Sequence, residues 1–289
     1  MTEASIFVED AVVLANDVLP AEQYLLRLQS PNCAQTVKPG NFIQLSCFKD
    51  NYSLKRPFSI LRSSPEKGWI EVLYKVVGKG SKALSQAKPN DVLQSLGPIG
   101  NSFELSSAQA IPLLLGGGVG IPPIVFFAEQ LRKTKQISAF TILGSEIPFP
   151  FAVKPSTILV ENIPDGVIAS MSLLEDLSIP SRLTSKQGYP GCFDGYIHEL
   201  ADKWLQQLSS EELARVEVFA CGPTVMLEAV AGLCNKLNVR CSLSLEEYMA
   251  CAVGGCAGCT VEIEEQGQKK MKRVCVDGPV FDAEAVYPN

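Results

Sequence analysis

Four of the ten cysteines in this 289-residue chain lie in one stretch near its C-terminal end. Cys251, Cys256 and Cys259 follow a C-x4-C-x2-C spacing and Cys275 stands apart from them, which is the plant-type pattern of ligands to a [2Fe–2S] cluster. The residues between the first three cysteines are mostly alanine and glycine, which allow a loop to wrap closely around a small cluster. We therefore predict that these four thiolates hold a [2Fe–2S] cluster.

Two other interpretations of the same cysteines remain open. Four cysteines can hold a structural zinc ion, although zinc sites usually pair two C-x2-4-C knuckles and Cys275 belongs to no such knuckle. The thiols could also form disulfides or be inert. The remaining cysteines show no metal-binding spacing, and we expect most of them to be small buried apolar residues. They are Cys33, Cys47, Cys192, Cys221, Cys234 and Cys241.

A second candidate site is the segment Arg56-Pro57-Phe58-Ser59. Proline fixes φ, and strand alternation places Arg56 and Phe58 on the same side of an extended segment. An arginine can pair with a pyrophosphate while the neighbouring residues lie along an isoalloxazine ring. This combination indicates a flavin site, but an edge strand with an exposed arginine would contain the same residues.

The glycine-rich turn Gly78-Lys79-Gly80-Ser81 precedes a short helical pattern. We expect Ser81 to be the N-cap of that helix, and the free N–H groups at such a helix start attract phosphate. A turn without a ligand is the alternative interpretation. The nearby flavin signal favours a phosphate at this turn.

Two further motifs follow predicted strands and indicate a nucleotide. Gly116-Gly117-Gly118-Val119-Gly120 comes directly after an apolar run, as in strand-to-helix turns that let a dinucleotide's pyrophosphate approach the backbone. Cys221-Gly222-Pro223 follows another apolar run and is expected at the edge of the same crevice, where the thiol could pack against a nicotinamide. A tight connection without a ligand and a buried structural cysteine are the alternatives.

Composition excludes several classes of function. The net charge of −6 and the pI near 5.1 provide no basic surface for nucleic acid. The N-terminal residues do not resemble a secretory signal, and no apolar run is long enough to span a bilayer, so we expect a cytoplasmic protein without a membrane span. The single histidine, His198, is expected at the surface or at a helix cap, and no constellation suited to hydrolysis accompanies it.

The elements that must position these motifs predict an α+β multidomain fold. Short β-rich runs separated by turns over residues 1–106 predict an antiparallel β-barrel that would bind FAD. Alternating strands and helices over 107–241 predict a doubly wound α/β nucleotide domain, and 242–289 would form a small [2Fe–2S] domain. Within the middle part we expect strands at 111–115, 137–143, 157–160 and 216–220, and helices at 124–133, 198–208 and 224–237.

Taken together, the motifs resemble those of the ferredoxin-reductase-like flavoproteins, and in particular the electron-transfer subunits of class 1B dihydroorotate dehydrogenases. The resemblance extends over essentially the whole chain. It rests on R-P-F-S at 56–59, L-Y-K-V-V-G-K-G-S at 73–81, G-P-I-G-N at 97–101, G-G-G-V-G-I-P-P at 116–123, C-G-P at 221–223 and S-L-E-E-Y-M-A-C at 244–251.

The resemblance implies cofactors, site residues and a partner. FAD would be held by Arg56, Pro57, Phe58, Ser59, Leu73, Tyr74, Lys75, Gly80 and Ser81. The NAD(P) site would be lined by Gly116, Gly117, Gly118, Gly120, Cys221, Gly222 and Pro223. The [2Fe–2S] cluster would be held by the four cysteines named first. The chain would be an oxidoreductase subunit of pyrimidine biosynthesis. It would pass electrons between its cofactors and an FMN-containing dihydroorotate dehydrogenase catalytic subunit, its partner in a heterotetramer.

Three departures from the family pattern leave parts of this interpretation open. Ser81 replaces the usual threonine, and Ala252 replaces the usual glycine after the first cluster cysteine, where it is expected to crowd the loop. Ser185-Lys186-Gln187-Gly188 stands where T-D-D-G is common, so the choice between NAD and NADP is open and a lysine near the ribose could favour NADP. Two alternatives are a NAD(P)H reductase for a ferredoxin-type partner and a redox-sensing protein without turnover.

Overall fold

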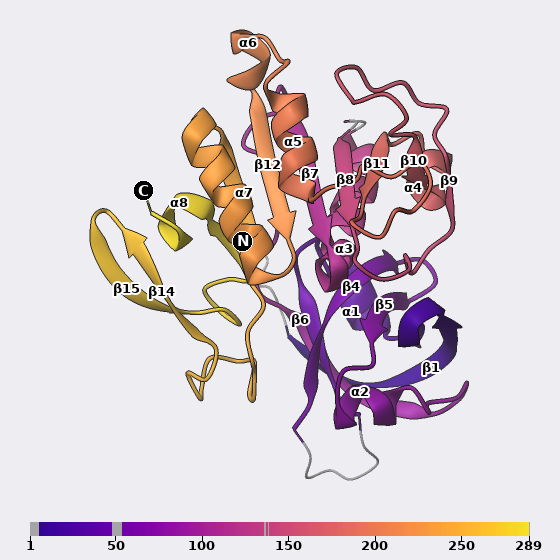
Figure 1. Ribbon diagram of the computed structural model, residues 1–289. Coiled ribbons are helices and arrows are strands. Elements are labelled where there is room, and N and C mark those ends of the chain that lie inside the picture. The colour runs from indigo at the N-terminus through magenta and orange to yellow at the C-terminus, as the bar shows by residue number, and fades with distance from the viewer. Residues whose placement is uncertain (1–5, 48–53, 136, 138, 289) are drawn as a thin grey trace.

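The computed structural model describes residues 6–47, 54–135, 137 and 139–288. Figure 1 shows a strand-rich N-terminal part, a layered central part with helices on both faces of a sheet, and a C-terminal part that lies beside the other two. No helix in the described part of the chain is long and apolar enough to cross a membrane.

The N-terminal part is a closed antiparallel barrel, as predicted. Its strands follow the order β1-β2-β5-β4-β3-β6. Their bounds are β1 (Phe7–Leu19), β2 (Gln23–Gln29), β3 (Phe42–Leu45), β4 (Arg56–Ser64), β5 (Trp69–Lys75) and β6 (Val92–Ile99). Short helices η1 (Pro20–Glu22), α1 (Pro31–Thr36) and α2 (Lys79–Leu84) connect them. Alternate strand residues such as Leu26, Leu28, Ile70 and Val72 are fully buried and fill the barrel.

The central part is a six-stranded sheet in the order β11-β8-β7-β12-β13-β16. Its parallel strands are β7 (Ile111–Gly117), β8 (Phe140–Gly144), β11 (Ser181–Thr184), β12 (Val216–Cys221) and β13 (Arg240–Ser244), and β16 (Val280–Asp282) is antiparallel to β13. On β7, Leu113 and Leu115 pack toward one face and Leu114 toward the other. Both faces are therefore apolar, as parallel sheets require.

Helices cover both faces of this sheet, which confirms the doubly wound prediction. α5 (Ile197–Leu205) and α7 (Thr224–Leu237) pack on the face of Leu113, while α3 (Ile121–Gln130) and α4 (Ser172–Asp176) pack on the face of Leu114. A π-helical turn, η3 (Leu131–Lys135), continues α3, and η2 (Gly118–Gly120) precedes it. The short α6 (Ser210–Leu213) leads into β12.

One predicted strand in this part is wrong. Residues 157–160 form no strand, and the strand lies earlier, at β9 (Val153–Pro155), paired with β10 (Ala169–Met171). The backbone N–H and hydroxyl of Thr157 instead donate to the Glu175 carboxylate, at 2.6 and 2.8 Å. Leu159, which contributed to the apolar signal, is 84% exposed. The predicted strand at 137–143 is β8, beginning at Phe140; residue 138 lies outside the described residues.

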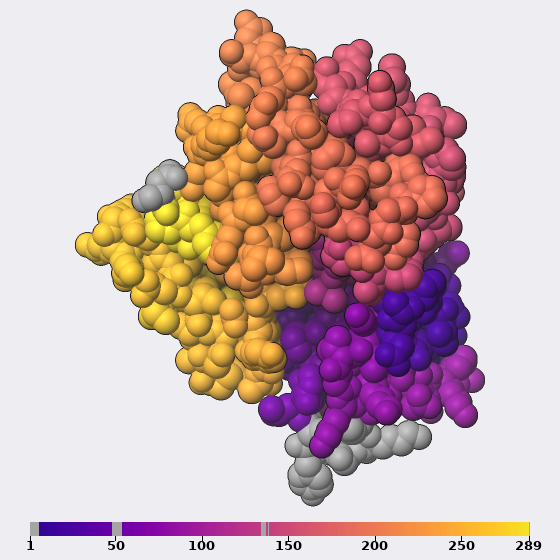
Figure 2. Space-filling model, viewed as in Figure 1, coloured from indigo at the N-terminus to yellow at the C-terminus, as the bar shows by residue number. Residues whose placement is uncertain are grey.

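The C-terminal part is a hairpin of β14 (Thr260–Glu265) and β15 (Gln268–Arg273), followed by β16 and α8 (Ala283–Val286). Figure 2 shows this segment in contact with both the barrel and the central layer. Cys259 and Cys275 share a buried apolar cluster with Phe42 and Ile99 of the barrel. The cysteine-bearing segment is therefore packed directly onto the barrel wall.

A buried ion network joins the barrel to the central part. Glu129 on α3 is 4% exposed and accepts hydrogen bonds from Arg62 on β4, at 3.0 and 3.3 Å. Glu71 on β5 is 2% exposed and contacts both Arg62, at 3.8 Å, and Arg27, at 2.5 Å. Lys133 also reaches Glu129, at 2.5 Å. Because a buried carboxylate is costly without a partner, Arg62 stabilises one such group within its own barrel, Glu71, and one across the interface, Glu129.

Replacing Arg62 with methionine should lower the stability of the protein. Arg62→Met removes one partner from each of Glu71 and Glu129, while Arg27 and Lys133 remain, so we expect a loss of about 2–3 kcal/mol. Urea unfolding of the holoprotein measures it. The control is Lys203→Met, at an exposed lysine of α5, which should change stability by less than about 0.5 kcal/mol. Equal effects of the two changes on the free energy of unfolding would contradict the stabilising role of Arg62 between Glu71 and Glu129.

Candidate functional site

The four cysteines of the predicted cluster site lie together at the base of the β14–β15 hairpin. Cys259 and Cys275 are buried, Cys251 is half-buried and Cys256 is exposed. The backbone N–H of Cys256 donates to the Cys251 sulfur at 3.3 Å, and that of Gly258 donates to the Cys256 sulfur at 3.4 Å. N–H groups aimed at sulfur stabilise thiolates, so the loop is suited to anionic sulfur ligands.

The sulfurs are arranged in two pairs. Hydrogen bonds from the backbone of Val253 and Cys256, together with contact with the Cys256 thiol, lower the pKa of Cys251 to about 7. Burial, together with contact with the Cys259 thiol, raises the pKa of Cys275 to about 11. Four thiols arranged as two pairs suit a two-iron cluster.

The loop accommodates Ala252 in an unusual backbone conformation. Ala252 has φ +54° and is 1% exposed, and Ala257 has φ +55°. The left-handed region carries a modest cost for residues other than glycine. Ala252 belongs to the apolar cluster that contains Phe42 and Ile99, so its methyl group contributes to the packing against the barrel.

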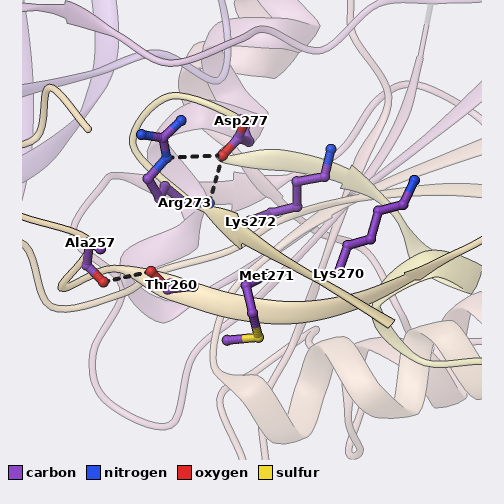
Figure 3. A pocket seen from close by; sticks show the side chains of 7 residues that line it. All are labelled: Ala257, Thr260, Lys270, Met271, Lys272, Arg273 and Asp277. Atoms are coloured by element: carbon purple, nitrogen blue, oxygen red, sulfur yellow. Dashed lines mark hydrogen bonds and ion pairs between the residues drawn. The ribbon is translucent and has the colours of Figure 1, made fainter. Parts of the chain in front are cut away.

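A hollow of about 480 Å³ lies beside this loop on the hairpin. Its lining is Ala257, Thr260, Lys270, Met271, Lys272, Arg273 and Asp277. Figure 3 shows Lys270 and Lys272 pointing to one side of β15 and Met271 to the other. Arg273 donates to the Gly254 carbonyl at 3.0 Å and pairs with Asp277 at 3.4 Å, so it fastens the cluster loop to the hairpin.

The G-P-I-G-N motif at 97–101 meets residues 277–280 where the cysteine-bearing segment joins the barrel. The Asn101 N–H donates to the Gly278 carbonyl at 2.7 Å, while its side chain donates to the Val280 carbonyl at 2.8 Å and accepts from the Val280 N–H at 2.9 Å. Gly100 has φ +87°, and a Cβ there would lie 2.4 Å from Pro279. Asn101 is a positioning residue that the sequence reasoning missed, although the motif containing it was noted.

The residues expected to hold FAD gather on one side of the barrel. β4 carries Arg56, Pro57, Phe58 and Ser59, all half-buried, and β5 carries Leu73, Tyr74 and Lys75. The Phe58 and Tyr74 rings meet edge to face at 5.7 Å, and the Tyr74 hydroxyl donates to Asn16 at 3.2 Å. A Cβ on Gly80 would lie 3.2 Å from the Arg56 side chain, so the start of α2 lies against this arginine. An aromatic face and a cation beside a helix start fit a flavin with its pyrophosphate.

The expected N-cap role of Ser81 is wrong. α2 begins at Lys79 with Gly78 as the N-cap, and Ser81 is its third residue. The Ser81 hydroxyl accepts hydrogen bonds from the N–H groups of Val77 and Gly78, at 2.9 and 3.2 Å. The Ser81 side chain therefore stabilises the turn before α2 from inside the helix, because a serine at the third helical position can bond to the backbone of the N-cap residue.

The glycine loop and the Cys221 turn contact each other at the carboxyl edge of the central sheet. A Cβ on Gly120 would lie 2.2 Å from the backbone of Cys221 and 2.4 Å from the N atom of Gly222. Gly116 and Gly117 pair with Leu143 and Gly144 in the sheet, while Gly118 has φ +54° and open space around it. Pro223 is exposed and precedes α7. The structure thus brings the two predicted nucleotide motifs into contact at this edge of the sheet.

The Cys221 thiol lies fully buried at this edge. Burial and the nearby Glu246 carboxylate raise its pKa well above the usual range, so it is a neutral thiol at physiological pH. Glu246 is exposed along part of its surface, but the surrounding protein desolvates its carboxyl and raises its pKa to about 7. The sequence reasoning missed this neighbour of Cys221, although it belongs to the quoted S-L-E-E run. His198 is half-buried and stacks on Tyr196 at 6.0 Å, and so lies outside these sites.

Comparisons with known proteins agree with this arrangement. A family profile described as the iron-sulfur cluster binding domain of dihydroorotate dehydrogenase B matches residues 246–287. A profile described as the oxidoreductase FAD-binding domain matches residues 8–103. The first range contains the four predicted cluster cysteines, and the second contains the barrel strands except for Phe7 at the start of β1.

Relatives match this chain over nearly its whole length. The chain is 34% identical over 276 residues to the dihydroorotate dehydrogenase B (NAD(+)) electron transfer subunit of Caldanaerobacter subterraneus subsp. tengcongensis, covering 96% of this chain and 97% of the relative. The corresponding subunit of Desulforamulus reducens is 32% identical, over 94% of this chain and 95% of its own length. An NADH-dependent reduced ferredoxin-NADP oxidoreductase shares the fold, with a TM-score of 0.75, 24% identity and coverage of 96% and 90%.

Replacing Gly120 with alanine should disrupt the contact between the two turns. The added methyl group would collide with backbone atoms of Cys221 and Gly222, so we expect Gly120→Ala to cost about 3 kcal/mol or more. The matched control is Gly232→Ala in α7, where the space is open and alanine should stabilise the helix by about 0.5–1 kcal/mol. The urea unfolding midpoints of both variants test this prediction. A Gly120 variant as stable as the Gly232 variant would contradict the close contact between the glycine turn and the Cys221 turn.

Proposed function

This chain belongs to the family of electron-transfer subunits of dihydroorotate dehydrogenase B, and from that premise we propose how its own residues perform electron transfer. The chain would connect a catalytic subunit that oxidises dihydroorotate to orotate with NAD⁺, through a [2Fe–2S] cluster and FAD. The observation that carries the proposal is the shared apolar cluster of Cys259, Cys275, Phe42 and Ile99, which joins the cysteine loop to the barrel. This packing supports a short route between the two cofactors.

For the flavin, we propose a site on β4, β5 and α2. Arg56, beside Gly80 and Ser81, would pair with the pyrophosphate, and the segment from Pro57 to Ser59 would lie along the ring system. Leu73, Tyr74 and Lys75 would complete the site from β5. The hydrogen bond from Tyr74 to Asn16 fixes the ring that contacts Phe58. When bound, FAD would exchange a hydride with nicotinamide and single electrons with the cluster.

For the cluster and the nucleotide, we propose the ligands that the motifs predict. Cys251 and Cys256 would form one pair of iron ligands, and Cys259 and Cys275 the other. Nicotinamide nucleotide would lie over the glycine turn, with its reactive ring near the neutral Cys221 thiol, which is too protonated to act as a nucleophile. The chain therefore needs no acid or nucleophile of its own for this work.

We further propose three functional units, with FAD in 1–106, NAD in 107–241 and the cluster in 242–289, and a cytoplasmic location. The catalytic subunit would bind next to the cysteine loop, because electrons must enter close to the cluster. Cys256 is exposed there, and large apolar residues are also exposed nearby in the sequence: Tyr248 at 94%, Val253 at 50% and Val276 at 41%. Exposed apolar side chains of this kind are common anchors at interfaces.

Removing one cluster ligand should separate the two electron-transfer steps. In Cys256→Ser we expect iron and acid-labile sulfide to fall to a small fraction of the wild-type content, while FAD stays bound and NADH still reduces it. Metal analysis and stopped-flow absorbance of anaerobically purified protein measure both effects. The control is Cys192→Ser, outside the loop, which should keep the full cluster content. Zinc in place of iron, or an unchanged iron content in the Cys256 variant, would contradict the cluster assignment.

The docking surface can be tested with the catalytic subunit itself. Mixed with that subunit, the wild-type chain should support NADH formation from dihydroorotate and NAD⁺. Tyr248→Glu places a charge at the proposed contact and should weaken association at least about tenfold, as for an interface hot spot. It should leave flavin reduction by NADH intact. Leu159→Glu, at a residue 84% exposed outside the cysteine loop, is the control. If both variants bind equally well, the partner docks elsewhere.

A further inference from the structure

The carboxyl ends of three neighbouring strands form one edge of the proposed nucleotide site. Gly117 at the end of β7 pairs with Gly144 at the end of β8, and Gly144 pairs with Thr184 at the end of β11. Neighbouring strands lie about 4.8 Å apart, so the end of β11 is about 10 Å from the glycine turn. If the pyrophosphate lies at the glycine turn and the nicotinamide near Cys221 on β12, the adenosine half extends over β8 and β11.

Glu146 is fixed at this edge, two residues beyond the end of β8. One carboxylate oxygen accepts a hydrogen bond from the backbone N–H of Lys186, and the other from the side-chain amide of Gln187, both at 3.3 Å. Both donors lie in the turn that follows β11. Glu146 is nevertheless exposed, so its carboxylate retains acceptor capacity for a ligand.

The Lys186 ammonium has partners of its own beyond the turn. Its nitrogen lies 3.8 Å from the Asp194 carboxylate and 5.9 Å from the centre of the Tyr196 ring. The Glu146 carboxylate lies between the ends of β8 and β11 and accepts from the Lys186 backbone, not from its ammonium. With Glu146 and Asp194 set against Lys186, this edge carries a net negative charge.

We propose that Glu146 accepts hydrogen bonds from the hydroxyl groups of the adenosine ribose and thereby selects NAD over NADP. In dinucleotide-binding sheets, a carboxylate after the strand that follows the glycine turn binds the ribose 2′-hydroxyl. β8 is that strand here. A 2′-phosphate adds close to two negative charges, which the Glu146 carboxylate would repel. The acid that is missing from residues 185–188 is thus supplied by the neighbouring strand, and Lys186 does not bind a 2′-phosphate.

This inference rests on the proposed nucleotide site, and equilibrium binding tests it separately from turnover. Isothermal titration calorimetry of the cofactor-loaded chain would use ADP-ribose and 2′-phospho-ADP-ribose as probes. The wild type should bind ADP-ribose at least about tenfold more tightly than its 2′-phosphate. Glu146→Gln keeps the shape but loses the charge, so ADP-ribose should bind about tenfold more weakly, in line with loss of a hydrogen bond to a charged group. The preference between the two probes should nearly disappear.

Two further variants keep the outcome clear. Glu211→Gln, on α6 at the opposite end of the sheet, should bind both probes like the wild type. Lys186→Gln should also keep the preference for ADP-ribose. A wild type that prefers the 2′-phosphate, a preference unchanged in Glu146→Gln, or selective loss of 2′-phosphate binding in Lys186→Gln would each overturn the proposal. Flavin reduction by NADH is measured in parallel, and its absence would instead count against the proposed function.

Discussion

The arrangement of the whole chain depends on two buried carboxylates that share one arginine. Glu71 belongs to the barrel and Glu129 to the first helix after the glycine turn, and Arg62 lies between them. Each carboxylate is nearly inaccessible to water and has a second cation on its own side of the interface, Arg27 for Glu71 and Lys133 for Glu129. Arg62 is the cation that bridges the two carboxylates, so it favours one mutual orientation of the barrel and the sheet. That orientation sets where a flavin on β4 and β5 would face a nucleotide bound over β7.

A second junction, made of neutral groups, fixes the third part of the chain. Asn101 bonds to the backbone of Gly278 and Val280, and the cysteine loop packs against Phe42 and Ile99. Hydrogen bonds set the direction of this junction, and apolar burial supplies most of its stability. An electron carrier benefits from this combination, because the distance between its cofactors must not fluctuate.

Much of this could be predicted from the sequence, because its strongest signals are local. Local sequence patterns predict the cluster cysteines from their spacing and the strand β7 from the apolar run before Gly116. They also predict the helix α7 with the bounds that the structure has. What escaped prediction depends on groups far apart in the chain. Residues 157–160 have the sequence pattern of a strand, but the backbone N–H of Thr157 donates to the Glu175 carboxylate instead of to a neighbouring strand. The positions of Asn101, Glu146 and Glu246 likewise depend on segments that only the folded chain brings together.

The pairing of β16 with β13 has a consequence for the edge of the central sheet. Residues 280–282 form the outer strand of a sheet whose other strands all end before residue 245. If β16 detached, the edge of β13 would be left unpaired. Such edges recruit other strands and promote aggregation. The segment that carries the cysteines therefore also protects the sheet from aggregation, because β16 follows Cys275 in the chain.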